Sequence, residues 1–260
     1  MITLVDDKLL NKFSSLNYDN PFWCKISSLF SSYGYEMKDI AFWIQTVNEK
    51  VTAVIAKNIL SAVVYIEEGA NFSEIEEFLY AIGIETVTLD RKFLKHFNFS
   101  EAKYGIIMKY KGSSKQTIKQ LPESCSLSSP KVKDIVDFLI SSFPQDFNEV
   151  DYSNVYVDIS HRIRHNELYA LAVESGNKLM AIGMIVAETD LSAVIGAVYT
   201  AFPFRKKGIA SYIVNSLLYR LKESNKSVYV FREKDKNKEF YIKLGFQDID
   251  LWTEVKLFKH

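Results

Sequence analysis

Apolar and polar positions in the second half of the chain follow two different periods. Strand-like apolar runs separated by the turns SGNK and ETDLS predict an antiparallel meander, and its third run, AVIGAVY, is apolar at nearly every position, which predicts a strand buried on both faces. From Lys207 to about Leu221 apolar residues recur every three or four positions, as in a helix with one apolar stripe. The predicted elements are strands at Leu168–Glu174, Leu179–Ala187 and Ala193–Tyr199, this helix, a strand at Ser227–Phe231, a helix at Asp235–Leu244 that ends at Gly245, and a final strand or two in FQDIDLWTEVKLF.

Two helices are predicted before this meander. Ser129 can cap a helix and Pro130 suits its first position, and KVKDIVDFLISSF then continues with helical spacing. A second helix is expected from Asn154 to His165. The meander and the elements after it follow the order β-β-β-α-β-α-β.

The first half of the chain predicts the same order. Its helix at Ser73–Ala81 has the capping-box pair Ser73 and Glu76, and Gly83 closes it. Residue identity between the halves is low, so the likeness concerns topology alone. The remaining elements are strands at Phe42–Val47, Val51–Lys57 and Leu60–Ile66 before that helix, and a strand at Ile84–Leu89, a short helix at Arg91–Phe97 and a strand at Tyr104–Tyr110 after it.

A polar segment, KGSSKQTIKQLPESCSLSSP, separates the two halves. It is rich in Ser, Lys and Gln and contains two prolines, a composition typical of a linker. We therefore expect an N-terminal domain at 1–115, a linker at 116–130 and a C-terminal domain at 131–260.

Composition and charge narrow the class of protein. The 260 residues allow two domains or one large one; apolar residues make up 48%, and no run approaches the ~20 apolar residues that span a bilayer. The N-terminus lacks the features of a secretory signal, and the isolated Cys24 and Cys125 favour a reducing compartment, so we expect a soluble, cytoplasmic protein. Lys plus Arg equals Asp plus Glu at 32 each, so we expect neither nucleic acid nor membrane as a partner.

The segment VYTAFPFRKKGIAS joins the third strand of the meander to the following helix. A helix N-terminus presents unpaired N–H groups and the positive end of its dipole, which favours phosphate. Arg205, Lys206 and Lys207 add positive charge, and Gly208 lets the backbone approach an anion closely. The alternative is a basic loop that caps a helix and faces solvent. Neither the P-loop pattern nor the dinucleotide-binding GxGxxG pattern is present.

The corresponding junction in the first half has the opposite charge. Glu67-Glu68-Gly69-Ala70-Asn71 stands where the second half has its three cations. We therefore expect the N-terminal domain to lack a phosphate loop, and the chain to have one phosphate site if the C-terminal loop holds phosphate.

Two motifs resemble a known family. GAVYTAFPFRKKGIASYIVNSLL followed by EFYIKLGF is similar to the GCN5-related N-acetyltransferases (GNAT), over about residues 120–260, with the proline one residue further from Thr200 than usual and Ala210 in place of a glycine. The resemblance implies an α+β fold with a mixed, mostly antiparallel sheet flanked by helices, here in two tandem domains, and acetyl-CoA as co-substrate. It also implies that the backbone of Val198, Tyr199 and Thr200 pairs with the pantetheine arm, and that the N–H groups of Arg205, Lys206, Lys207, Gly208, Ile209, Ala210 and Ser211 hold the pyrophosphate.

The chemistry implied by this resemblance is transfer of an acetyl group from acetyl-CoA to a primary amine. Tyr241 stands where such proteins often carry the acid that protonates the leaving thiolate; the alternative is a core residue beside Phe240 and Phe246. Glu188 is the candidate base, and its alternative is a solvated turn carboxylate. The asparagine that often contacts CoA in the family is replaced by Lys234.

A last cluster lies in YVDISHRIRHNE. Asp158, His161, Arg162 and His165 share one helix face, which favours a solvated face with an Asp158–Arg162 pair over a histidine base. No metal is expected, because the histidines lack a further ligand at a recognisable spacing. The expected acceptor is a small amine of unknown identity bound by a monomer or homodimer; the alternatives are a non-catalytic acyl-CoA-binding module and a protein or peptide N-acetyltransferase.

Overall fold

The chain forms two compact units that are interleaved in sequence. The computed structural model describes residues 1–37, 39–112, 120–144, 152–176 and 178–257. Unit 1 contains Met1–Lys109, Phe231–Lys238 and Asp248–His260, and unit 2 contains Tyr110–Val230 and Glu239–Gln247. Among the helices that the structure describes, none combines the length and apolar character needed to cross a bilayer.

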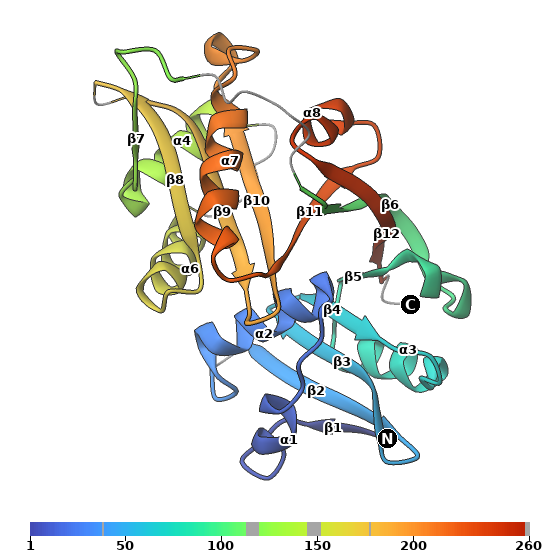
Figure 1. Cartoon of the computed structure of the whole chain (residues 1–260). Helices are drawn as coiled ribbons and strands as arrows, with labels where there is room; N and C mark the ends of the chain where they lie inside the picture. Colours follow the sequence, from blue (N-terminus) through green and yellow to red (C-terminus); the bar gives the residue numbers. More distant parts are fainter. Residues whose placement is uncertain (38, 113–119, 145–151, 177, 258–260) are drawn as a thin grey trace. The chain divides into compact units, whose positions relative to one another are not determined.

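The sheet of unit 2 is the predicted meander extended at both edges. β7 (Ser126–Ser128), β8 (Tyr169–Ser175), β9 (Lys178–Glu188) and β10 (Ser192–Thr200) pair antiparallel in that order (Figure 1). β11 (Ser227–Glu233) then pairs parallel with β10. The mixed, mostly antiparallel sheet flanked by helices confirms the α+β fold class.

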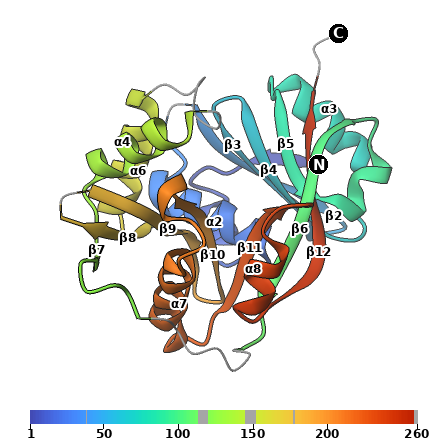
Figure 2. The same ribbon diagram turned by 90° about the horizontal axis from the view of Figure 1, so that it is seen from above.

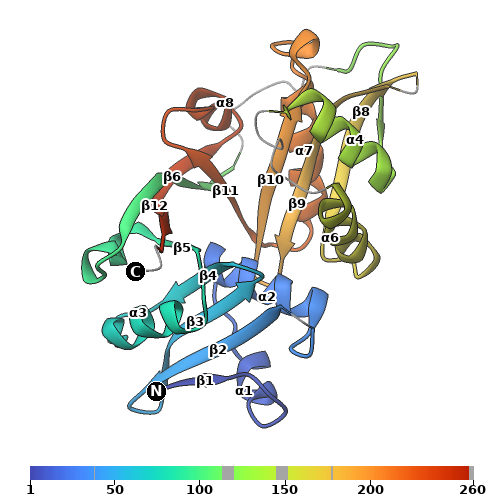
Figure 3. The same cartoon turned by 180° about the vertical axis from the view of Figure 1, so that it is seen from behind.

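Helices cover both faces of this sheet. α4 (Val132–Ser142) and α6 (Tyr152–Arg164) lie on one face and α7 (Ile209–Lys222) lies on the other, while α8 (Lys238–Lys243) follows β11 (Figures 1, 2 and 3). α7 packs closely because Gly183 of β9 has no side chain: a Cβ there would lie 2.6 Å from Cγ2 of Ile213. α4 begins at Val132 with Lys131 as its N-cap, so the predicted start, with Ser129 as cap and Pro130 as first residue, was wrong by two residues.

The burial of β10 changes along its length. Ser192, Ala193, Val194 and Ile195 are buried as AVIGAVY predicted, but the strand is only half-buried from Gly196 to Thr200. The change coincides with the end of the ladder to β11, which joins Ser192–Ile195 to Ser227–Val230. The prediction of burial on both faces was therefore correct only for the first part of the strand.

Unit 1 repeats the order of unit 2. β2 (Ile40–Val47), β3 (Lys50–Asn58) and β4 (Ser61–Ile66) form a meander, and β4 pairs parallel with β5 (Thr86–Asp90) as β10 does with β11. α3 (Phe72–Ala81) connects the parallel strands, and the 3-10 helix η1 (Arg91–His96) and β6 (Ser100–Tyr110) follow. The sequence pattern missed β1 (Ile2–Leu4), α1 (Leu10–Ser14) and α2 (Pro21–Tyr33).

The cap of α3 differs from the expected one. Asn71 is the N-cap, and its side chain accepts a hydrogen bond from the backbone N–H of Glu74 at 3.1 Å. The predicted capping box of Ser73 and Glu76 was therefore two residues out of register, because asparagine fills the same role.

The last strand of the chain completes the sheet of unit 1. β12 (Phe246–Lys256) pairs antiparallel with β5, from Trp252 opposite Asp90 to Lys256 opposite Thr86. Most of β12 thus belongs with the N-terminal half, and the spatial division differs from linear domains at 1–115 and 131–260. Within the expected linker at 116–130, residues 116–119 lie outside the described residues and Ser126–Ser128 pairs with β8 as β7.

Candidate functional site

The C-terminal part of β10, which leads to the basic loop, has an irregular backbone. Its register with β9 shifts between Gly196 and Tyr199, and Ala197 has a φ of 48°. Among the ladder pairs that the structure describes, those with β11 end at Ile195. Backbone groups beyond the bulge are therefore placed where an extended chain of amides could pair with them.

The basic loop turns sharply before α7. A 3-10 turn at Phe202–Phe204 contains Pro203, Lys206 has a φ of 60°, and Gly208 is the N-cap in the left-handed region at a φ of 86°. Within the part of the chain that the structure describes, no side chain caps α7 at this end. The first N–H groups of α7 are thus left for a ligand or water.

The cations of this loop are exposed. The guanidinium of Arg205 donates from Nε to the carbonyl oxygen of Thr200 at 3.0 Å, which ties it to the end of β10. Its Cζ lies 5.9 Å from the ring centre of Phe143, and Nζ of Lys207 lies 5.6 Å from that of Phe204. Arg205 and Lys207 are therefore kept beside the helix N-terminus while their charged groups face solvent.

Tyr241 lies on α8 among aromatic side chains. Its ring centre is 4.8 Å from that of Phe240 and 5.6 Å from that of Phe246, and 7% of the residue is exposed. Burial raises the pKa of the phenol to about 12, so the group keeps its proton at neutral pH. This placement is compatible with both functions expected of Tyr241, a proton donor and a packing residue.

Glu188 forms an ion pair. It ends β9, where it faces Ala193 at the start of β10, and its Oε1 accepts a hydrogen bond from Nζ of Lys226 at 2.7 Å. Both side chains are mostly buried. The pair gives Glu188 a structural partner at the end of β10 away from the basic loop, so its role as a base stays a prediction.

Lys234 also has an aromatic neighbour. Its ammonium lies 5.0 Å from the ring centre of Tyr104, and a hydrogen bond with this side chain raises the pKa of the lysine. Both residues belong to unit 1.

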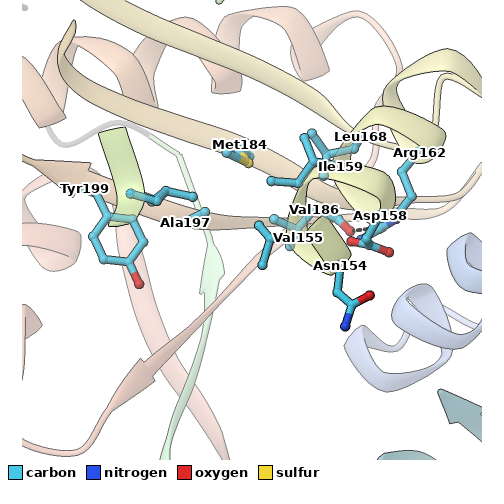
Figure 4. A pocket seen from close by; sticks show the side chains of 11 residues that line it. Asn154, Val155, Asp158, Ile159, Arg162, Leu168, Met184, Val186, Ala197 and Tyr199 are labelled. Atoms are coloured by element: carbon cyan, nitrogen blue, oxygen red, sulfur yellow. Dashed lines mark hydrogen bonds between the residues drawn. The ribbon is translucent and has the colours of Figure 1, made fainter. Parts of the chain in front are cut away.

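A cavity of about 480 Å³ lies on the sheet face covered by α4 and α6. β10 contributes Ala197 and Tyr199 to its lining, and β9 contributes Met184 and Val186 (Figure 4). α4 contributes Leu139. Leu168, just before β8, also lines the cavity, and the residues from α6 are Asn154, Val155, Asp158, Ile159 and Arg162.

The structure divides the predicted cluster on α6, which contains Asp158, His161, Arg162 and His165, into two parts. Asp158 and Arg162 line the cavity, and Nη2 of Arg162 donates to the carbonyl oxygen of Val186 at 2.6 Å. The rings of His161 and His165 stack on each other with centres 4.2 Å apart. The sequence analysis did not predict the cavity. The signal that could have indicated it is the helical spacing of three residues from Val155 to Asp158 and from Ile159 to Arg162, which places apolar and charged side chains on one face. Among the described residues, no group of three or more His, Cys, Asp or Glu side chains could hold a metal ion.

Comparison with known proteins identifies the family of the C-terminal half. Residues 132–246 match the model of the acetyltransferase (GNAT) family. This segment contains the basic loop, the cavity and Tyr241, and it is a GNAT domain. No curated protein matches the sequence of this chain.

Solved structures share the fold of almost the whole chain. A tandem GNAT protein from the clavulanic acid biosynthesis pathway, solved without acetyl-CoA, has a TM-score of 0.67 at 11% identity, with 99% of this chain and 98% of that one covered. A GNAT-family acetyltransferase from Colwellia psychrerythraea has a TM-score of 0.61 at 12% identity, covering 99% and 100%. A Drosophila protein reaches 0.68 at 9% identity, covering 98% of both chains. At these identities the likeness shows the fold alone, which for the first of them is a tandem GNAT arrangement.

Proposed function

We propose that this protein transfers an acetyl group from acetyl-CoA to the primary amine of a small acceptor, in the cytoplasm, as a monomer or homodimer. The observation that carries the proposal is that three features follow one another along the chain in unit 2. They are the bulge in β10, the exposed cations of the basic loop, and the N-terminus of α7, which no described side chain caps. The GNAT family match over residues 132–246 supports the same assignment.

The basic loop is the proposed pyrophosphate site. The left-handed conformation of Gly208 directs the following N–H groups toward an anion, and a helix N-terminus favours negative charge. Exposed lysine and arginine side chains add attraction that salt weakens. The proposed contacts are the N–H groups of Arg205, Lys206, Lys207, Gly208, Ile209, Ala210 and Ser211.

β10 is the proposed support for the pantetheine arm. Its backbone at Val198, Tyr199 and Thr200 follows the bulge, and this part of the strand lies beyond the ladder with β11. Amide groups of pantetheine would pair with this edge as an added strand does. The thioester would then lie next to Ala197, which also lines the cavity.

The reaction itself needs two proton transfers. A neutral amine nitrogen attacks the thioester carbon, the N–C bond forms, and the C–S bond breaks with release of a thiolate. Tyr241 would give its phenolic proton to that thiolate, and a base or solvent would take the proton that the amine loses. The raised pKa keeps Tyr241 protonated but also makes it a weaker acid, so its contribution to the rate is expected to be moderate.

The test of this function uses the full chain and a panel of amines, amino acids and peptides, with release of free CoA thiol as the readout. Amine-dependent thiol release and a product heavier by one acetyl group would support the transferase. Tight binding of CoA with no turnover on any amine would instead support a non-catalytic acyl-CoA-binding module. Failure to bind CoA at all would refute both.

A further inference from the structure

The cavity on the α4 and α6 face has two unlike ends. Figure 4 shows Asn154, Asp158 and Arg162 together on the side of α6, while Tyr199 of β10 lies at the opposite side of the lining. The polar residues recur every four positions, so they form one row along the helix. A ligand that fills the cavity therefore meets charge at one end and β10 at the other.

The polar end contains one positive and one negative side chain. Asp158 and Arg162 are one helical turn apart, a spacing that places their Cβ atoms about 5–6 Å from each other. Arg162 is anchored by its bond to the carbonyl of Val186, and its Nε is buried without a hydrogen-bond partner among the described residues. A guanidinium held in this way has N–H groups left for a carboxylate.

The two charges exclude most simple head groups. A ligand with only a carboxylate would be attracted by Arg162 and repelled by Asp158, and a ligand with only an ammonium would meet the reverse. A zwitterion, in which a carboxylate and an ammonium share one carbon, complements both side chains. The head group of a free α-amino acid has this arrangement.

The middle of the cavity is apolar. Val155 and Ile159 line it from α6, and Met184 lines it from β9. Methylene groups suit such a lining, because removing apolar surface from water is favourable. The end at Ala197 lies on the strand where the thioester is proposed to lie.

We propose that the acceptor is a free α,ω-diamino acid of the lysine or ornithine class, an inference that rests on the proposed function. Arg162 binds its α-carboxylate, Asp158 binds its α-ammonium, and the methylene chain crosses the apolar middle. The side-chain amine then reaches the thioester beside β10. The amine nitrogen forms a bond to the acetyl carbon as the C–S bond breaks, and the product is the ω-N-acetyl amino acid with free CoA.

Three matched acceptors test the head group. L-lysine, 6-aminohexanoate and cadaverine share a terminal amine and chain, but the second lacks the α-amine and the third lacks the carboxylate. We expect kcat/KM to be about 10- to 100-fold higher for lysine or its shorter homologue ornithine than for either analogue, the range of one hydrogen bond to a charged group. Mass spectrometry should find the acetyl group on the side-chain nitrogen.

Two variants connect each half of the head group to its side chain. Asp158→Asn should lower kcat/KM for lysine at least tenfold. It should leave kcat/KM for 6-aminohexanoate unchanged or raise it, because this acceptor has no α-amine and its carboxylate no longer meets a negative charge. Arg162→Gln should lower it for lysine and 6-aminohexanoate but not for cadaverine. Arg164→Gln, an exposed charge change on the same helix, is the control and should alter none of the three. CoA affinity should stay at the parental value in all variants, which shows that they fold.

The outcomes separate this inference from the proposed function. Turnover of cadaverine or a peptide-embedded lysine as fast as free lysine, or acetylation of the α-nitrogen, would overturn the diamino acid while leaving the transferase intact. Equal loss on all three acceptors in Asp158→Asn would also overturn it. Thiol release that no amine increases would instead refute the proposed function itself.

Discussion

The side chain of Gln45 forms hydrogen bonds with both the backbone carbonyl and the backbone N–H of Asn71. Its Nε2 donates to the Asn71 carbonyl oxygen at 2.9 Å, and its Oε1 accepts from the Asn71 N–H at 3.0 Å. Gln45 is fully buried, and its Nε2 also donates to Glu74 at 2.7 Å. Because Asn71 caps α3, the position that would face a phosphate in unit 1 is filled by the protein's own polar groups and by a carboxylate.

This arrangement predicts a stoichiometry of one CoA per chain. The loop of unit 1 is acidic and internally bonded, whereas that of unit 2 is basic and uncapped. Isothermal titration calorimetry of the full chain with CoA should show a single class of site with a ratio near one. A ratio near two would mean that unit 1 also binds, contrary to this account.

Gly208→Glu should weaken CoA binding by about tenfold or more, because it places a carboxylate where the pyrophosphate is expected. Arg205→Ala should weaken it less, since backbone groups provide most of the proposed contacts. Gly69→Glu is the matched control: Gly69 has a φ of 87°, close to the 86° of Gly208, but lies in the loop of unit 1. Equal CoA affinity in Gly208→Glu and Gly69→Glu, with both folded, would refute the phosphate role.

Local patterns predicted the elements and the antiparallel pairing of β8, β9 and β10, but not the partner of the last strand. Period-2 and period-3.6 spacing placed both meanders and α7 to within a few residues, because side-chain burial sets those periods. The partner of β12 was missed: its pairing of Trp252 with Asp90 joins positions far apart in sequence, and any exposed strand edge could accept that apolar pattern. The basic loop was found because its chemistry is contiguous in sequence.

The cavity and the Glu188–Lys226 pair needed tertiary structure. Glu188 looked like a turn carboxylate because its partner Lys226 is 38 positions away, just before β11. Asp158 and Arg162 looked like a solvated pair because only the packing of α6 against β9 and β10 turns one of its faces into a cavity wall. Helical spacing predicts which residues share a face, but it does not predict which elements pack against that face.

Gly105→Ala should destabilise unit 1. A Cβ at Gly105 would lie 2.1 Å from the carbonyl oxygen of Arg232 and 2.5 Å from Nε1 of Trp252, two atoms joined by a hydrogen bond of 3.1 Å. We expect a loss of about 2–4 kcal/mol in the free energy of unfolding, measured by denaturant titration. Gly196→Ala is the comparison. The atom nearest to its added Cβ would be Cγ2 of the Val186 side chain, at 3.1 Å, so this substitution should cost about 1 kcal/mol or less. Similar losses in both variants would contradict the close approach at Gly105.

The pKa of Tyr241 predicts a change of stability at alkaline pH. Burial raises this pKa to about 12 from an ordinary value of 10.0, so the unfolded chain loses the proton first as pH rises. The contribution is complete below pH 10 and is lost between pH 10 and 12; the loss can reach about 2–3 kcal/mol. Unfolding of the parent and of Tyr241→Phe, followed from pH 8 to 12, should show a steeper decline in the parent. Parallel curves would mean that the phenol is not desolvated in the fold.

Tyr241→Phe also tests whether this residue gives a proton to the leaving thiolate. The ring and its packing against Phe246 are retained, so CoA affinity and stability at neutral pH should change little. The turnover number should fall by roughly 10²-fold, the lower range for general acid catalysis. The loss should shrink with an acyl donor whose thiol is more acidic, because a better leaving group needs less assistance. Tyr229→Phe removes a phenol from another buried position of unit 2 and is the control, for which we expect parental rates. Steady-state rates for the three proteins with both donors decide the matter: a parental rate in Tyr241→Phe would assign the residue to packing alone and leave the proton to solvent.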